Sequence, residues 1–344
     1  MFRYGLAALA AAVLVLACTA RPAERSDMPT QQQRQLLPLQ ASYSAQVLSQ
    51  VPIAIAKAAG YFEEQGLDVT LAAVRLGAQN TAALVSGEID VSVLGGTAPL
   101  RARLGGADLR LIASTKPYFA GAIVAGPEIT SPADLRGKRL GIGSKGGNPD
   151  LMARAVLPRF GIEPDRDVAF LNTGGALETV AALVAGSVDA GSVIPPADYQ
   201  ARNLGFHVVI DVTAARIPFL AVVLGTASST ISSRPEALER FVRAYAQAVH
   251  RYMTDKDFTL QVAAEFSPTD DPVANEQAYE LERSIMQTDL DVPLAAVRAS
   301  LDLMKAEDPR VADAQPEEFV DLRFVQRLKE SGFLDRLYGG NAGR

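Results

Sequence analysis

Six short segments are the parts of this sequence best equipped to contact a small molecule. Most are rich in glycine, serine, threonine, asparagine or glutamine, and most run directly into an expected helix. They are residues 42–46, 76–79, 95–97, 144–148, 172–175 and 194–196. Glycine lets a ligand approach the backbone, and a helix N-terminus offers free N–H donors with a partial positive charge. For one segment alone helix capping explains the residues equally well, so the site prediction depends on all six converging.

The candidate ligand-binding residues lie in or beside these segments. They are Ser42, Tyr43, Ser44, Gln46, Gly77, Gln79, Gly95, Gly96, Thr97, Lys116, Ser144, Lys145, Gly147, Asn148, Asn172, Thr173, Gly174, Pro195, Pro196 and Tyr199. Lys145 is the only cation within a segment, which makes it the main expected cation of the cleft. Tyr43, Tyr118 and Tyr199 could stack on a flat ligand or pack in the core.

One of these segments contains a pattern that is also found in dinucleotide-binding proteins. Residues 141–146 read GIGSKG, which follows an expected strand and precedes a helix. However, Asn148-Pro149 begins the helix after the glycines, and the next strand ends in Asn172-Thr173 without a carboxylate for a ribose hydroxyl. We therefore expect no nicotinamide or flavin dinucleotide, and no other cofactor.

Catalytic equipment is scarce. The chain has two histidines, His207 and His250, and neither has a partner at metal-ligand spacing. Nucleophile-elbow, zinc-protease and P-loop motifs are absent from the sequence, so we expect no catalytic residue and no metal site. The net charge is −6 without basic runs, which argues against nucleic acid as a partner.

Strand and helix patterns alternate along the chain and then repeat. From residue 36 a strand–helix–strand–helix–strand pattern runs to residue 95, and the same order recurs from residue 137 to 194. The repeat is visible in the letters: residues 82–90 read AALVSGEID and residues 181–189 read AALVAGSVD. In each copy a helix ends at glycine and a strand begins. We therefore expect Asp90 and Asp189 to be turn and capping residues rather than ligand-binding residues.

The predicted fold class is therefore α/β with two lobes, each a mostly parallel sheet flanked by helices. The expected boundaries are residues 36–118 for lobe 1, 119–224 for lobe 2 with its crossing segments, and 225–344 for the return to lobe 1 and a helical C-terminal tail. Residues 119–129 and 219–226 are the expected crossings. In such sheets ligands bind at the carboxyl ends of the strands, where the six segments lie.

The N-terminus indicates export. Residues 1–17 contain Arg3 followed by an apolar stretch too short to span a membrane, which predicts a signal peptide. Cys18, the only cysteine, ends the sequence VLAC, which resembles the lipobox of bacterial lipoproteins, and a cysteine in an ordinary signal peptide is the alternative. Residues 18–35 would then be a lipidated cysteine and a flexible tether.

Several longer segments resemble ABC-transporter substrate-binding proteins. They are PIAIAKAAGYFEEQGLDVTL, ALVSGEIDVSVLGGTAPL, SPADLRGKRLGIGSKGG, AALVAGSVDAGSVIPP and FVDLRFVQRLKESGFLD. The most similar group comprises binders of sulfonates, nitrate, taurine and thiamine pyrimidine precursors. The resemblance implies a type II-like periplasmic-binding-protein fold that closes on a small solute, with an ABC permease and an ATPase as partners.

The resemblance further implies a monomer in the periplasm or on the outer face of the cytoplasmic membrane, lipid-anchored at Cys18. Because tryptophan is absent and Lys145 is the main cleft cation, a neutral or heterocyclic solute such as a vitamin precursor is favoured over a strong anion. Two alternatives stay open: an enzyme on the same scaffold, similar to a pyrimidine synthase, and a receptor that presents its ligand to a sensor.

Overall fold

The computed structural model describes residues 36–74, 77–267, 271–305 and 307–339. The expected signal peptide, Cys18 and the tether lie outside the described residues. Residues from Leu36 onward form one compact unit. Within the described residues, no helix has the length and apolar character needed to cross a membrane.

The first sheet has the strand order β2-β1-β3-β10-β4. Its strands are β1 (Leu37–Tyr43), β2 (Leu67–Ala73), β3 (Val91–Leu94), β4 (Leu109–Tyr118) and β10 (Pro218–Ala227). Strand β1 pairs in parallel with β2 and β3, whereas β10 lies antiparallel between β3 and β4. We call this sheet and the helices packed on it the first lobe.

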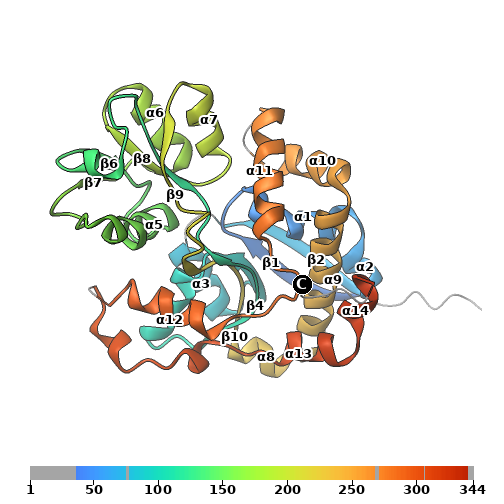
Figure 1. Ribbon diagram of the computed structural model, residues 1–344. Coiled ribbons are helices and arrows are strands. Elements are labelled where there is room, and N and C mark those ends of the chain that lie inside the picture. Colours follow the sequence, from blue (N-terminus) through green and yellow to red (C-terminus); the bar gives the residue numbers. More distant parts are fainter. Residues whose placement is uncertain (1–35, 75–76, 268–270, 306, 340–344) are drawn as a thin grey trace, which may run out of the picture. The chain divides into compact units, whose positions relative to one another are not determined.

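The second sheet repeats this topology, with the order β7-β6-β8-β5-β9. Its strands are β5 (Ala122–Ala125), β6 (Arg139–Gly141), β7 (Ala169–Leu171), β8 (Ala190–Val193) and β9 (His207–Asp211). Strand β6 is parallel to β7 and β8, and β5 is antiparallel to β8 and β9. This sheet and its helices are the second lobe, so the two-lobed fold with mostly parallel sheets is confirmed (Figure 1).

Helices follow the strands in both lobes. They are α1 (Val51–Ala58), α2 (Tyr61–Glu64), α3 (Gly77–Ser86) and α4 (Thr97–Leu104) in the first lobe, and α5 (Asn148–Val156), α6 (Ala176–Val184) and α7 (Ala197–Asn203) in the second. Pro52 lies in the first turn of α1, where its missing N–H is not needed. A short 3-10 helix, Leu48–Gln50, precedes α1.

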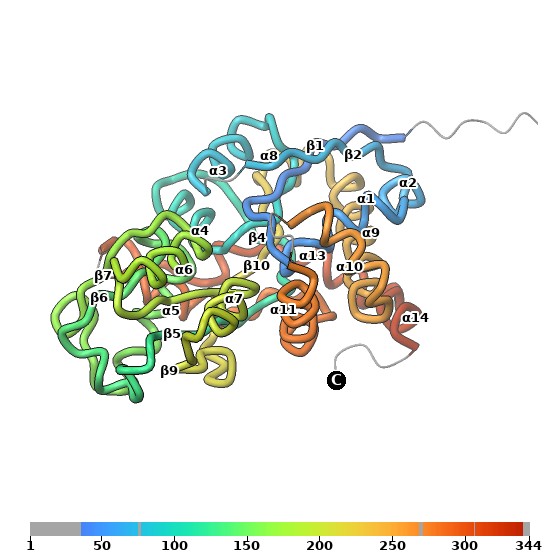
Figure 2. The backbone as a smooth tube through the Cα atoms, turned by 90° about the horizontal axis from the view of Figure 1, so that it is seen from above, coloured from blue at the N-terminus to red at the C-terminus, as the bar shows by residue number. Residues whose placement is uncertain are grey.

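The C-terminal part is helical, as predicted. It contains α8 (Ser228–Ser233), α9 (Pro235–Thr254), α10 (Lys256–Phe266), α11 (Pro272–Ile285), α12 (Leu294–Asp302), α13 (Arg323–Glu330) and α14 (Phe333–Leu337). Apolar side chains of α9 recur at helical spacing, and Phe241, Tyr245 and Val249 enter the same core as Leu39 of β1. Seen from above, α9, α10 and α14 gather beside α1 and α2 (Figure 2).

The doubled nonapeptide has the predicted structural role in both lobes. Gly87 and Gly186 end their helices with φ values of 78° and 66°, in the left-handed region that glycine adopts readily. Asp90 accepts a hydrogen bond from the backbone N–H of Gln40 at 2.8 Å, and Asp189 accepts the matching one from Arg139 at 2.8 Å. Arg139 also lowers the pKa of Asp189 to about 2. Each aspartate therefore links the beginning of its own strand to the backbone of the neighbouring strand.

The chain crosses between the sheets twice. It leaves the first sheet after β4 and returns through β10, and Phe119 stacks on Phe219 with ring centroids 3.8 Å apart. The predicted crossing segments, residues 119–129 and 219–226, begin at these two rings. However, residues 122–125 already form β5 of the second sheet, and residues 218–227 form β10 of the first. The segments between the sheets are therefore residues 119–121 and 212–217.

Candidate functional site

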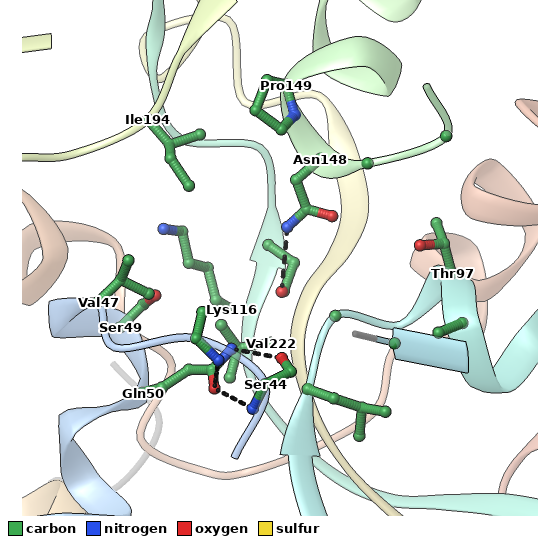
Figure 3. Close-up of a pocket in the computed structure, with 18 of the residues that line it drawn as sticks. Ser44, Val47, Ser49, Gln50, Thr97, Lys116, Asn148, Pro149, Ile194 and Val222 are labelled. Atoms are coloured by element: carbon green, nitrogen blue, oxygen red, sulfur yellow. Dashed lines mark hydrogen bonds between the residues drawn. The ribbon is translucent and has the colours of Figure 1, made fainter. Parts of the chain in front are cut away.

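A pocket of about 890 Å³ lies where residues of the two lobes face each other. The first lobe contributes residues that follow β1 and β3, together with parts of β4 and β10, and the second contributes the loop before α5 and the end of β8. This volume is in the range of small-molecule sites. The segments that follow β1, β3, β6 and β8 thus meet there, as expected for an α/β ligand site. Figure 3 shows side chains around the pocket, among them Ser44, Lys116 and Asn148.

The structure brings half of the predicted residues into the pocket lining. These are Ser44, Gly77, Gly95, Thr97, Lys116, Ser144, Lys145, Gly147, Asn148 and Pro195. They come from both lobes, so the segments after β1, β3, β6 and β8 do converge. Ligand contact by these side chains stays a prediction.

Several predicted residues of the first lobe do not line the pocket because they have structural partners. The Ser42 hydroxyl is buried and donates to Oδ1 of Asn80 at 2.8 Å, and the Tyr43 ring packs on Phe266 with centroids 4.7 Å apart. Gln46 donates from Nε2 to the carbonyl of Phe266 at 2.9 Å.

Two further first-lobe residues also lie outside the lining. The backbone N–H of Gly96 donates to the carbonyl of Leu220 at 2.9 Å, which fixes the turn from β3 into α4. Gln79 is on α3 and is exposed to solvent.

The predicted second-lobe residues that lie outside the lining belong to two places. Asn172 is exposed, whereas Thr173 accepts from the N–H of Gly143 at 3.0 Å and Gly174 donates to the carbonyl of Gly143 at 2.9 Å. These bonds tie the loop after β7 to the loop after β6. Pro196 is buried, and the guanidinium of Arg202 lies over the Tyr199 ring, 4.1 Å from the ring centroid.

The aromatic ring in the pocket lining is not one of the three tyrosines predicted to stack on a ligand. Of the described residues that line it, none is a tyrosine, and Phe119 is the only aromatic. Phe119 was not predicted because it lies in an apolar run that reads as a crossing segment.

A buried glutamine holds the first-lobe wall in place. Oε1 of Gln50 accepts from the backbone N–H groups of Ser44 and Ala45, each at 3.1 Å, and its Nε2 donates to the Ser44 hydroxyl at 3.1 Å. Figure 3 shows Gln50 against Ser44, with Val47 and Ser49 beside it. Gln50 was not predicted from the sequence, because a glutamine before a helix is common on protein surfaces.

Asn148 links the second-lobe wall to the first lobe. It begins α5, and its Nδ2 lies 3.4 Å from the carbonyl oxygen of Ala221 in β10. Its Oδ1 faces Gly95, where an added Cβ would be 3.4 Å away. The N-terminal turn of α5 therefore brings the amide of Asn148 to the pocket.

The pocket carries more charge than the sequence predicted. Besides Lys145, it is lined by Lys116 and by Arg101, which was not among the candidates. Arg101 pairs with Glu307 at 2.8 Å, and Lys145 is 3.9 Å from the same carboxylate with two thirds of its side chain exposed. Arg101 and Lys116 are each paired with a glutamate of the pocket, and Lys145 is the most exposed of the three cations, so the expectation of a neutral solute stays a prediction.

The most buried charged pair of the pocket joins Lys116 of β4 to Glu282 of α11. Nζ lies 2.6 Å from Oε1, and the side chains are 7% and 3% exposed. The Lys116 side chain extends between Val47 and Ile194 (Figure 3). Neither Glu282 nor Glu307 was a candidate, because acidic residues in amphipathic tail helices resemble ordinary solvated positions.

Catalytic and metal-binding groups are not gathered in this region. The described residues that line the pocket include no histidine, cysteine or aspartate. Across the described part of the chain, no group of three or more His, Cys, Asp or Glu residues could hold a metal ion. His207 is 2.8 Å from the carbonyl of Ile129, and His250 meets the edge of Tyr338 with burial lowering its pKa.

This combination of two lobes with repeated topology and a polar pocket between them defines a periplasmic-binding-protein fold. A profile of the NMT1/THI5-like family matches residues 49–257. Because this span exceeds half of the sequence, the chain belongs to the NMT1/THI5-like family.

The chain is also similar to known proteins in sequence or in fold. YtlA of Bacillus subtilis (strain 168), whose name describes a binding protein, is 22% identical over 271 residues, which cover 70% of this chain and 80% of YtlA. The periplasmic aliphatic sulphonate binding protein SsuA from Escherichia coli superimposes with a TM-score of 0.69 and 19% identity, covering 83% of this chain and 92% of SsuA. The desulfurization enzyme DSZB gives a TM-score of 0.64 and 17% identity, covering 85% and 99%.

Proposed function

We propose that this protein is an extracytoplasmic solute-binding receptor of an ABC importer. It would capture a small organic solute between its lobes and deliver it to the permease, whose transport a cytoplasmic ATPase drives. The observation that carries the proposal is the pocket of about 890 Å³, lined from both lobes by glycines, hydroxyls, amides and the N-terminal residues of α4 and α5. Ligand contacts to both lobes would stabilise their closure.

A thermal-shift screen of the full chain tests this proposal. Sulfonates, nitrate, pyrimidines, flavins and amino acids would be offered singly. A ligand that binds only the folded state stabilises it by about 2.7 kcal/mol at a hundredfold excess over its dissociation constant. We expect at least one compound to raise the unfolding midpoint. A complete panel without a shift would contradict the proposal.

A matched pair of variants tests the site. Asn148→Ala removes an amide that lines the pocket, whereas Asn172→Ala removes an exposed amide outside it. We expect the first to raise the dissociation constant of the identified solute about fivefold and the second to leave it within about twofold, since one hydrogen bond contributes about 1 kcal/mol. Equal effects of the two variants would show that the site assignment is mistaken.

An enzyme on this scaffold is the second candidate, because DSZB shares the fold. The lining of the described pocket offers two glutamates and no histidine, cysteine or aspartate. Both glutamates form ion pairs, so neither is placed as an obvious general base. We favour binding without turnover. Mass spectrometry of the bound solute after prolonged incubation distinguishes the two, and a chemically altered product would establish the enzyme.

We also propose that Cys18 carries a lipid that anchors the receptor at the outer face of the cytoplasmic membrane. The motif VLAC and the preceding apolar stretch support this proposal. In a bacterial host, globomycin should leave the precursor unprocessed, and Cys18→Ala should release the protein from the membrane fraction. Unchanged processing and fractionation would point to an ordinary signal peptide.

A further inference from the structure

The buried end of the pocket contains a carboxylate with one oxygen unused. Oε1 of Glu282 meets Nζ of Lys116 at 2.6 Å, but Oε2 is buried and has no hydrogen-bond partner among the described residues. Glu282 is 2% exposed and lines the pocket. A buried acceptor left without a donor costs free energy, so this oxygen calls for a partner that the described residues do not supply.

Two other buried polar side chains, on helices that contact α11, also lack a hydrogen-bond partner among the described residues. Asp198, at the start of α7 in the second lobe, also has a buried oxygen, Oδ1, without a partner. Helix α7 packs on α11, the helix of Glu282, and burial together with the charge of Glu282 raises the pKa of Asp198. The hydroxyl of Tyr252 is buried and unpartnered as well, and Glu282 contributes to raising the pKa of this phenol.

Lys116 supplies the complementary half of the pair. An ammonium has three N–H donors and no acceptor, and one of them is engaged by Glu282. The side chain reaches into the pocket (Figure 3), so its remaining donors can meet an acceptor atom of a bound molecule. The pair therefore presents one anionic acceptor and adjacent donors to the same region.

We propose that Glu282, held in place by Lys116, accepts a hydrogen bond from an N–H group of the solute. The pocket would accordingly take small organic molecules that carry an amine, amide, amidine or ring N–H. A nitrogen donor fits better than a hydroxyl, because the donor nitrogen of an ammonium, amide or ring N–H has no free lone pair, whereas a hydroxyl oxygen brings lone pairs that need donors of their own. This inference rests on the proposed receptor function and narrows its substrate class.

Matched probe pairs test the inference on the full chain. The pairs are 3-aminopropanesulfonate with propane-1-sulfonate, benzamide with methyl benzoate, and 2-pyrrolidinone with γ-butyrolactone, measured by isothermal titration calorimetry. A hydrogen bond to a charged group corresponds to a preference of about tenfold to a hundredfold. Where a probe pair binds, we expect its N–H member to bind more tightly by that factor. Comparing the amine pair with the two amide pairs distinguishes a charged N–H donor from a neutral one.

Variants assign the preference to Glu282. The double variant Lys116→Met/Glu282→Leu replaces the buried pair by apolar side chains of similar volume, a change that folded proteins often tolerate. The control Lys256→Met/Glu280→Leu removes an exposed Lys–Glu pair at 2.7 Å that involves the same helix, α11. We expect the first to abolish the N–H preference and the second to retain it. If the first does not fold by circular dichroism, Glu282→Gln replaces it and should reduce the preference.

The outcomes separate this inference from the receptor function. Binding of both members of each pair with equal affinity, or a preference that survives loss of Glu282, would overturn the inference and leave the receptor standing. If neither these probes nor the solute panel bound at all, the receptor function would fail and the inference with it.

Discussion

At the residue scale, the buried charged pair of the pocket restricts which solute can bind more than the polar loops do. Lys116 was predicted as a ligand residue, but its partner Glu282 comes from a helix whose sequence reads as an ordinary amphipathic surface element. A pair this buried is stabilised only if its other hydrogen-bonding groups are also satisfied, which makes it sensitive to what enters the pocket.

Asp198 predicts an unusual pH dependence of stability. Burial, assisted by the charge of Glu282, raises the pKa of Asp198 to about 6, although Arg202 on the same helix opposes the shift. The folded state then binds a proton that the unfolded state, with the ordinary aspartate pKa, releases. The free energy of unfolding should therefore rise as pH falls from about 7 to about 5.

The variant Asp198→Asn removes this titration. Two pKa units correspond to about 3 kcal/mol over the full range, so we expect wild type to gain about 1–2 kcal/mol relative to the variant between pH 7 and pH 5, about half of it. Urea unfolding at both pH values measures the difference. Parallel pH profiles of the two proteins would mean that Asp198 keeps an ordinary pKa in the folded state.

At the element scale, the turn from β3 into α4 has room for a side chain at one of its two glycines and not at the other. A Cβ at Gly96 would lie 2.4 Å from Cβ of Leu220, whereas one at Gly95 would meet nothing nearer than Asn148 Oδ1 at 3.4 Å. Gly96→Ala should cost about 1–3 kcal/mol of stability by overpacking. Gly95→Ala should leave stability nearly unchanged but weaken solute binding, because it narrows the space between the lobes.

Thermal unfolding and solute titration of both variants measure these effects. A stable Gly96→Ala protein would imply that the turn into α4 can shift away from β10. Unchanged affinity of Gly95→Ala would imply that the solute does not approach this turn.

The repeated nonapeptide allows an internal comparison. Gly87 and Gly186 have positive φ values, and an added Cβ would meet no atom within 4 Å at either position. Alanine at each site therefore costs only backbone strain, about 1–2 kcal/mol. We expect Gly87→Ala and Gly186→Ala to lower the free energy of unfolding by similar amounts in urea titrations. A difference of several kcal/mol would show that the two helix-to-strand turns are not structurally equivalent.

The sequence predicts elements well where the signal is local. The positions of β1–β3 and β6–β8 were predicted from hydrophobic runs, from glycines at helix ends and from the repeat. The same signals predicted that Asp90 and Asp189 lie at the beginning of their strands. The insertion of β10 between β3 and β4 was not predictable, since Val223 pairs with Leu94 from a distant part of the chain. For the same reason, Gln50, Arg101, Glu282 and Glu307 were missed, while loop residues such as Asn148 were found.

At the scale of the whole molecule, contact between the lobes depends on residues outside the pocket lining. Tyr199 belongs to α7 of the second lobe, yet its ring packs against the core cluster formed by first-lobe residues. Helix α7 adjoins α11 there, close to Asp198 and Glu282. Of the two roles predicted for Tyr199, ligand stacking and core packing, the described contacts show packing between the lobes.

This packing predicts that Tyr199 stabilises the closed arrangement. Tyr199→Ala should shift the population toward separated lobes, so the radius of gyration of the solute-free protein from small-angle X-ray scattering should increase. The apparent affinity should fall in proportion to the lost closed population, because only that arrangement offers both walls to the solute. Leu204→Ala, at an exposed position at the end of the same helix, is the control and should change neither quantity. A Tyr199→Ala protein with unchanged scattering and weakened binding would instead return Tyr199 to the ligand site.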